Sequence, residues 1–331
     1  MALIGAGWIA PAHLRALDRL GRTTLVGVAS AGRESAAAIA MPRGVPDDDN
    51  VARLLDEQRP DVAFVCVPPA AAVGIGLALV ERGIPFLIEK PLAAADAEGP
   101  VRLAAAIADR ELVVAVGYHL RGLDFLPEVR AELASAPPRT VVGRWLDGTP
   151  GPTWWRHAAT GGGQVIEQAT HLYDLARFLV GEATVIDAVD VPAAPPGATS
   201  LADSRAGDDG DVADGTAALL RFETGAIGAF VNTRRAPSGI VDLDLSGGGR
   251  RLTIRHASDD GERPATWELV VDDGSALRVR PATRDPYEVQ AEAFLDAVEA
   301  GDPGRVLASY ADALRTDRLT RAVVAATGNR G

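Results

Sequence analysis

The amino-acid sequence predicts a two-domain protein: an N-terminal α/β domain built on a parallel sheet, then an α+β domain containing a mostly antiparallel open sheet. Three observations predict it. The 331 residues are about twice the usual length of a domain, and 47% hydrophobic content is enough for two cores. In residues 1–120, short apolar runs alternate with helical segments, as in a parallel sheet wrapped by helices. In residues 121–331, longer stretches alternate apolar and polar residues, as antiparallel strands do.

The expected strands of the first domain are apolar on both faces, as buried parallel strands are. They follow a short run before Gly5 and span residues 24–29, 62–67, 85–89 and 112–117. Because only four residues precede Gly5, either the first strand is short or the chain begins upstream. Helices are expected between the strands, at residues 11–21, 50–58, 72–83 and 97–111. Glycine ends two of these helices and Asn50 opens another, in agreement with the preferences of helix ends.

In the second domain, one continuous helix is expected over residues 163–181, followed by strands and turns within residues 215–256. Residues 192–215 are rich in Pro, Ala, Gly and Asp, which predicts a long surface loop. Two further helices are expected at residues 285–301 and 310–326.

Composition excludes several classes of protein. The net charge of −12 argues against a nucleic-acid partner, because affinity for phosphate backbones depends on basic patches. A single cysteine, Cys66, excludes an internal disulfide framework and a cysteine-based zinc site. No apolar run approaches the roughly 18 residues of a membrane helix. We therefore expect a cytoplasmic protein without a membrane partner.

The first motif with chemical meaning is Gly5-x-Gly7-x-x-Ala10, directly after an apolar run and at the start of an expected helix. Gly5 permits a tight turn, Gly7 lets a pyrophosphate approach the backbone, and Ala10 permits close packing of helix on strand. This context predicts a dinucleotide-binding domain of the Rossmann type. The alternative is an ordinary strand-to-helix turn.

The end of the second strand bears on the choice between NAD and NADP. An NAD enzyme usually has an acidic residue there for the ribose hydroxyls, but this chain offers Ser30 and Arg33. We expect NADP to be slightly favoured over NAD, with Ser30 and Arg33 meeting the 2′-phosphate. The alternative is that Arg33 is a solvated arginine without a role.

Lys90 is the only lysine of the chain, and the other 32 basic side chains are arginines. It follows the expected strand 85–89, at the carboxyl end of a parallel strand, where ligands of open α/β sheets bind. A solvated position would tolerate arginine, whereas a site that needs a compact donor would not. The alternative is chance.

Glu167 and His171 are expected four residues apart on one face of the helix 163–181, roughly 6 Å from each other. Asp174 lies one turn further. A carboxylate beside an imidazole suits general acid/base catalysis near neutral pH. The alternatives are a surface ion pair and a metal site, and no metal is expected because no second histidine falls at ligand spacing. Trp154, Trp155 and Arg156 precede this helix, as core residues or as the wall of a pocket.

Taken together, these motifs resemble the glucose–fructose oxidoreductase, inositol dehydrogenase and rhizopine-catabolism (Gfo/Idh/MocA) family over nearly the whole chain. The matching stretches are "GAGWIA", "EKPLA", "VGYHLRGLDFLP", "WWR", "GGGQVIEQATHLYDL" and "YEVQAEAFLDAV". The resemblance implies a Rossmann domain followed by an α+β domain whose open sheet commonly forms the oligomer interface. A homodimer or homotetramer through that sheet is therefore expected.

The resemblance also implies roles for individual residues. Lys90 would contact both the nicotinamide ribose and the substrate hydroxyl, His171 would be the proton donor or acceptor, and Glu167 stands where the family has aspartate. The expected cofactor-binding residues are Gly5, Gly7, Trp8, Ile9, Ser30, Arg33, Val67, Pro68, Glu89, Lys90 and His119, and the expected substrate-binding residues are Lys90, Arg121, Trp155, Arg156 and His171. The chain departs from the family pattern at Val67 and Pro69, which have no polar side chain, and at Ala169, where glycine is usual.

We therefore expect an NAD(P)-dependent oxidoreductase that moves a hydride between nicotinamide and a secondary alcohol or ketone of a sugar, polyol or inositol-like substrate. The alternative is a nicotinamide-binding sensor or scaffold that kept the fold and lost turnover.

Overall fold

The computed structural model describes residues 1–193, 210–237, 239–257 and 265–328. The chain divides into two compact units. The first contains Met1–Gly122 and Arg284–Leu314, and the second contains Leu123–Thr283 and Arg315–Gly331. The first boundary lies close to the predicted one at residue 120, but Arg284–Leu314 packs with the first unit, whereas the sequence placed it in the second domain. Most of the predicted loop 192–215 lies outside the described residues.

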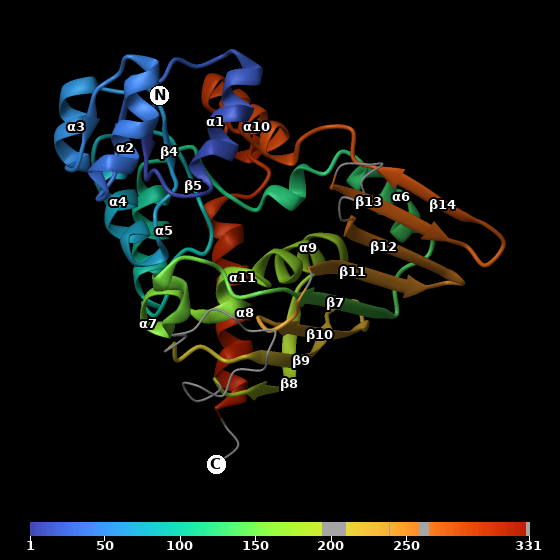
Figure 1. The fold of residues 1–331 in the computed structure, drawn as a ribbon. Coiled ribbons are helices and arrows are strands. Elements are labelled where there is room, and N and C mark those ends of the chain that lie inside the picture. The colour runs from blue at the N-terminus through green and yellow to red at the C-terminus, as the bar shows by residue number, and fades with distance from the viewer. Residues whose placement is uncertain (194–209, 238, 258–264, 329–331) are drawn as a thin grey trace. The chain divides into compact units, whose positions relative to one another are not determined.

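The first unit is built on a six-stranded sheet whose strands are all parallel, as predicted. Figure 1 labels β4 and β5 of this sheet. Its spatial order is β3-β2-β1-β4-β5-β6, which is the order of doubly wound dinucleotide-binding folds. The strands are β1 (Ala2–Ile4), β2 (Gly27–Ala29), β3 (Asp47–Asp48), β4 (Ala63–Val65), β5 (Phe86–Ile88) and β6 (Val114–Val116). The predicted strands are confirmed in place, although each is shorter than its apolar run, and β3 was not predicted.

Helices cover both faces of this sheet, and each face has its own buried apolar cluster. They are α1 (Ala10–Leu20), α2 (Arg33–Ala40), α3 (Val51–Gln58), α4 (Pro69–Glu81), α5 (Gly99–Asp109) and α10 (Pro286–Ala300). One cluster joins Leu14 of α1 and Phe294 of α10 to Leu3 and Phe64 of the sheet. This packing explains why α10, far along the chain, belongs to the first unit.

The second unit contains an eight-stranded sheet in the order β14-β13-β12-β11-β7-β10-β9-β8. Neighbouring strands are antiparallel except β7 and β10, which are parallel, so the predicted, mostly antiparallel sheet is confirmed. The strands are β7 (Thr140–Leu146), β8 (Ala183–Val191), β9 (Gly215–Phe222), β10 (Ile227–Thr233), β11 (Ile240–Gly247), β12 (Arg250–Ala257), β13 (Thr266–Asp272) and β14 (Leu277–Pro281).

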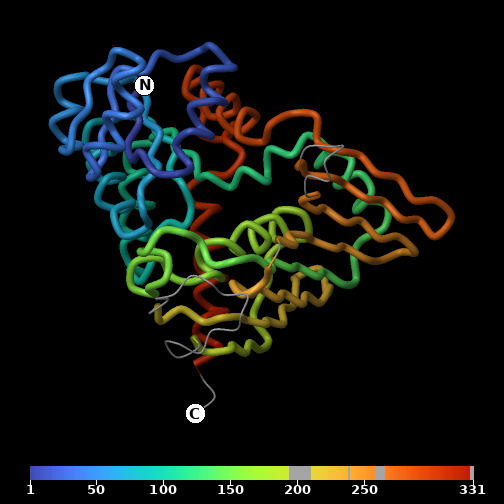
Figure 2. Tube along the Cα trace, viewed as in Figure 1, coloured from blue at the N-terminus to red at the C-terminus, as the bar shows by residue number. Residues whose placement is uncertain are grey.

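The helices of the second unit include α6 (Leu126–Ser135), α7 (Ala158–Gly161), α8 (Gly163–Glu167) and α9 (Thr170–Val180). The chain trace in Figure 2 shows α9 beside the middle strands of the sheet, and it packs on β7 and β11. The last helix, α11 (Tyr310–Thr327), begins in the first unit and continues in the second. None of the helices in the described part of the chain is both long enough and apolar enough to cross a membrane.

The prediction of one continuous helix over residues 163–181 was wrong. The helix is interrupted at Gln168 and Ala169, between α8 and α9. Both of their backbone N–H groups donate to the carbonyl of Gln164, so one turn is wider than a regular α-helical turn. The apolar period continues across the interruption, which is why the sequence pattern did not reveal it.

Candidate active site

The glycine loop at the carboxyl end of β1 fits a dinucleotide. Gly5 has a φ of 93°, and a Cβ there would lie 2.2 Å from the carbonyl oxygen of Cys66, so the fold itself requires glycine. Gly7 differs, because it is exposed and a Cβ there would meet only that oxygen, at 4.0 Å. Protein packing does not require glycine at position 7, and the bare backbone leaves room for a phosphate group.

The start of α1 has the properties of a phosphate site. Ile9 is its N-cap residue and no side chain caps the helix. The N–H of Ala10 donates to the carbonyl of Gly7, that of Ala12 donates to the carbonyl of Ile9, and Pro11 has no N–H, so the helix favours an anion through its dipole. Trp8, also in the loop, is 72% exposed. These features, together with Gly7, fit the pyrophosphate of a dinucleotide.

The residues expected to determine the preference for NAD or NADP are Ser30, directly after β2, and Arg33, the first residue of α2. The unpredicted strand β3 pairs with β2 beside them. The backbone N–H of Ser30 donates to the carbonyl of Asp48, so β3 carries carboxylates next to Ser30. Arg53 binds the Asp48 carboxylate through two hydrogen bonds of 2.6 Å, which lower the pKa of Asp48 to about 2. Arg33, 78% exposed in its side chain, lies 3.9 Å from Asp47.

The ends of β1, β4, β5 and β6 lie side by side in register, with Ile4, Val65, Ile88 and Val116 as neighbours. The residues that follow them therefore share one edge of the sheet. They include the glycine loop after β1, Val67 and Pro68 after β4, Glu89 and Lys90 after β5, and His119 after β6. Lys90 is partly buried and its bond to Pro91 is cis. The structure thus brings the expected cofactor-binding residues of this unit to a common edge.

One residue at this edge was missed by the sequence analysis. His13, on the buried face of α1, lies with its Nε2 atom 2.7 Å from Oε1 of Glu89, and its side chain is completely buried. The signal was a polar residue on a helix face otherwise made of Ala10, Leu14 and Leu17. This pattern predicts a core face, because the sequence does not show which residue a single histidine there would contact.

The second unit contains Glu167 and His171. Glu167 ends α8 and its Oε2 accepts a hydrogen bond of 2.7 Å from the indole Nε1 of Trp155, with both side chains buried. His171, in the first turn of α9, is 4% exposed and its ring stacks on Trp145 at 5.9 Å between centroids. The expected contact between Glu167 and His171 stays a prediction, with the two residues on successive short helices instead of one.

Local packing explains why these side chains are held in place. A Cβ on Gly161 would lie 2.9 Å from the backbone of Trp155, so the glycine run lets the Trp155 segment approach α8. Asp174, on α9, accepts a hydrogen bond of 2.9 Å from Thr316 of α11. These contacts anchor the two helices that carry Glu167 and His171.

Two of the expected substrate-binding residues have structural contacts. Arg121 is buried, donates to the carbonyl of Leu307 and lies 2.5 Å from Asp312, so its guanidinium is engaged within the first unit. Trp155 is 1% exposed, so the structure favours the core interpretation over a pocket wall. Arg156 is only partly buried, and none of the described residues accepts a hydrogen bond from its Nε.

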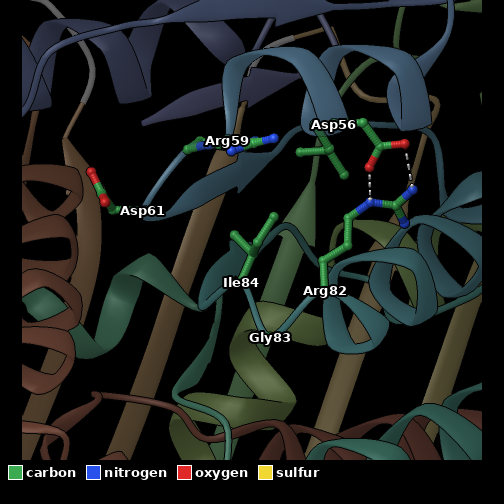
Figure 3. Close-up of a pocket in the computed structure, with 8 residues that line it drawn as sticks. Asp56, Arg59, Asp61, Arg82, Gly83 and Ile84 are labelled. Atoms are coloured by element: carbon green, nitrogen blue, oxygen red, sulfur yellow. Dashed lines mark hydrogen bonds and ion pairs between the residues drawn. The ribbon is translucent and has the colours of Figure 1, made fainter.

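A separate pocket of about 480 Å³ lies at the opposite edge of the first sheet (Figure 3). Asp61 and Ile84, which line it, precede β4 and β5, whereas the glycine loop and Lys90 follow strands. Arg82 in its wall is paired with Asp56. The pocket is therefore not the expected cofactor site. In the described part of the chain, no group of three or more His, Cys, Asp or Glu side chains is arranged to hold a metal.

The sheet order and the glycine loop are those of a dinucleotide-binding domain. Residues 1–118 match the model of an oxidoreductase family with an NAD-binding Rossmann fold, and residues 136–255 match the GFO/IDH/MocA C-terminal domain. The chain belongs to the Gfo/Idh/MocA family, as the sequence motifs indicated. It is an NAD(P)-dependent dehydrogenase or reductase.

Individual relatives are distant. The chain is 26% identical to levoglucosan dehydrogenase of Pseudarthrobacter phenanthrenivorans, over 90% of this chain and 86% of that protein. It is also 26% identical to inositol 2-dehydrogenase of Rhizobium meliloti, over 90% and 88% of the two chains. Among solved structures, the 3-ketoreductase KijD10 of Actinomadura kijaniata, in complex with NADP and TDP-benzene, shares the fold. Its TM-score is 0.82 at 20% identity, over 98% of this chain and 96% of that one.

Proposed function

We propose that the protein transfers a hydride between NAD(P) and a secondary alcohol or ketone of a sugar, polyol or inositol-like substrate. The observation that carries this proposal is the buried His171 on α9, stacked on Trp145, in a unit that also holds Glu167 through Trp155. The relatives named levoglucosan dehydrogenase and inositol 2-dehydrogenase support a carbohydrate-like substrate.

Three side chains have separate roles in this proposal. His171 accepts the proton of the substrate hydroxyl as the carbinol C–H bond breaks. Lys90 donates a hydrogen bond to the same oxygen and stabilises the charge that develops on it. Glu167, fixed by Trp155, orients His171 and stabilises its protonated form. Bound NAD(P) supplies the nicotinamide C4 that accepts the hydride, and the same groups act in reverse for ketone reduction.

The test is a screen of sugars, polyols, inositols and keto-sugars with both NAD and NADP, followed by absorbance at 340 nm. We expect cofactor reduction or oxidation with at least one member of these classes. Tight binding of cofactor without turnover of any of them would contradict the proposal and favour a nicotinamide-binding sensor.

We also propose that NADP is the preferred cofactor. Arg33 is exposed at the start of α2, and Asp48, the buried carboxylate beside Ser30, is bound to Arg53 and so is occupied. An exposed guanidinium three residues after Ser30 in the sequence matches the charge and hydrogen-bonding needs of a 2′-phosphate.

Arg33→Ala is therefore expected to weaken the binding of NADPH by about tenfold, the scale of one charge-assisted hydrogen bond, and to leave NADH binding nearly unchanged. The dissociation constants can be measured by quenching of protein fluorescence. Arg110→Ala, at the exposed end of α5, is the matched control and should alter neither constant. Tighter binding of NADH than of NADPH by the native protein would contradict the proposal.

Finally, we propose that the open face of the second sheet joins two or four copies of the chain. The register places a set of exposed apolar side chains on this face, namely Val189, Val191, Leu219, Ile227, Val231, Ile240, Leu277 and Val279. Cross-strand ion pairs such as Arg144–Asp242 lie among them. A large exposed apolar face on a sheet is typical of an interface. A monomer in sedimentation velocity at micromolar concentration would contradict it.

A further inference from the structure

The pair formed by His13 and Glu89 joins two parts of the dinucleotide-binding unit that are 76 residues apart in sequence. His13 lies on α1, the helix that begins after the glycine loop, and Glu89 directly precedes Lys90. The carboxylate itself is buried, with 8% of its side chain exposed. The backbone N–H of Glu89 donates to the carbonyl of Val65, so both the main chain and the side chain of Glu89 are held.

The surrounding residues are shaped around this contact. A Cβ on Gly117 would lie 2.6–2.8 Å from the carboxylate atoms of Glu89, so a larger residue there would displace the carboxylate. The imidazole of His13 packs against Phe64, at 5.7 Å between ring centroids, and edge-on against Tyr287 of α10, at 5.3 Å. Residues of α1, β4 and α10, together with Gly117 directly after β6, therefore supply side chains or space for the pair.

A purely structural role does not explain such a contact. Burying an ionised carboxylate is costly, and a buried polar pair can often be replaced by apolar side chains of similar volume without loss of stability. The α1 face around His13 is apolar, and Leu14 and Leu17 pack there without polar partners. A carboxylate at this position therefore indicates a ligand-binding role.

The second oxygen of Glu89 is the atom that offers such a role. Oε1 is engaged by His13, whereas no side chain or backbone N–H in the described part of the chain donates to Oε2. Glu89 follows β5, in the half of the sheet formed by β4, β5 and β6. In doubly wound folds the two halves of the sheet bind the two mononucleotide halves of the cofactor, so the glycine loop after β1 and the end of β5 serve different halves.

We propose that His13 is a positioning residue: its Nε2–H holds Glu89 so that Oε2 accepts a hydrogen bond from the nicotinamide half of the bound dinucleotide. The proposal rests on the proposed binding of NAD(P). His13 acts only through Glu89 and does not contact the cofactor. Its imidazole is completely enclosed, which suits a fixed support and excludes direct contact with a ligand.

The test separates the two halves of the cofactor by comparing NAD(P)H with adenosine 5′-diphosphate and its 2′-phosphate, which lack the nicotinamide half. His13→Met removes the N–H donor and keeps an apolar side chain of similar size. We expect it to weaken NAD(P)H binding by about tenfold, the scale of a hydrogen bond to a charged group, and to leave binding of the adenosine fragments nearly unchanged. His13→Gln, whose amide N–H reaches a similar position, should restore most of the lost affinity.

Two further variants show whether the effect passes through Glu89. Glu89→Met should produce the same loss for NAD(P)H, and the double variant with His13→Met should lose little more, because both changes remove one interaction. Leu17→Ala, on the same buried face of α1, is the control for general destabilisation of the helix. It should lower the melting temperature without separating the dinucleotide from the fragments.

The outcomes distinguish this inference from the proposed function. Equal weakening of NAD(P)H and of the adenosine fragments in His13→Met would show that the residue only supports α1, and would overturn the inference alone. Failure of His13→Gln to restore any affinity, or additive losses in the double variant, would also overturn it. Failure of the native protein to bind either dinucleotide would overturn both proposals.

Discussion

His171→Ala is expected to lower kcat by about 100-fold or more at neutral pH, the usual scale for loss of a general acid/base. The reason is that the substrate hydroxyl must release its proton as the hydride leaves, and alanine cannot accept it. His171 is 4% exposed and stacked on Trp145, so bulk water has poor access to its position. Steady-state kinetics on a substrate found by the screen measure the effect, and cofactor affinity should change little.

His256→Ala is the matched control for this experiment. His256 lies on β12, is exposed, and packs edge-on against Trp267 of β13. It should keep nearly native kinetics. If His171→Ala turned over at close to the native rate, the assignment of α8 and α9 as catalytic elements would be wrong.

Lys90→Arg is expected to lower kcat/KM by at least about 100-fold, which corresponds to a loss of about 2.7 kcal/mol of transition-state stabilisation. The exchange keeps the positive charge, so a loss must come from size and geometry. Arginine ends in a planar, bulkier group, whereas the ammonium of lysine is a compact donor aimed at one oxygen. Lys90 is partly buried between the held residue Glu89 and the buried Pro91, so a larger group cannot shift freely. A displacement of roughly 1 Å at a reacting atom can cost about 100-fold in rate.

The alternative, that Lys90 has no role in catalysis, predicts a different result. If Lys90 has no role, Lys90→Arg should be nearly silent, since surface substitutions usually change stability by no more than about 0.5 kcal/mol. Arg110→Lys, at the exposed C-terminus of α5, is the reciprocal control and should be silent in either case. The variant Lys90→Arg should also fold and bind cofactor as the native protein does. Comparable kinetics for native protein and Lys90→Arg would mean that the only lysine of the chain is there by chance.

The first sheet could be predicted because the sequence pattern that indicates each of its strands is local. Each of its buried strands is a short apolar run followed by a helix, and the pattern repeats in chain order. The strand β3 (Asp47–Asp48) escaped detection since it has two residues, both acidic, and its pairing with β2 is the only sign of it. Its absence from the prediction hid Asp48, the carboxylate beside Ser30.

The candidate site could be predicted only in part. Lys90 is predicted from its uniqueness and His171 from its spacing to Glu167, which are properties of the sequence, and their roles stay predictions. The contacts of His171 and Glu167 could not be predicted, because Trp145 stacks on His171 from strand β7 and Trp155 donates to Glu167 from a short 3-10 helix, Thr153–Arg156. The interruption between α8 and α9 likewise depends on packing, since the apolar period is continuous there.

The sequence by itself determined the class of each domain, the glycine loop and the edge of the sheet that carries Lys90, because strand periodicity and the conformational freedom of glycine are local properties. Only the tertiary structure decided that Arg284–Leu314 packs with the first sheet and that His13 reaches Glu89. Both depend on which surfaces remain to be buried once the sheet has formed. His13 contacts Glu89 only when α1 packs onto the sheet beside β5. A contact between residues so far apart in the sequence cannot be predicted from a local pattern.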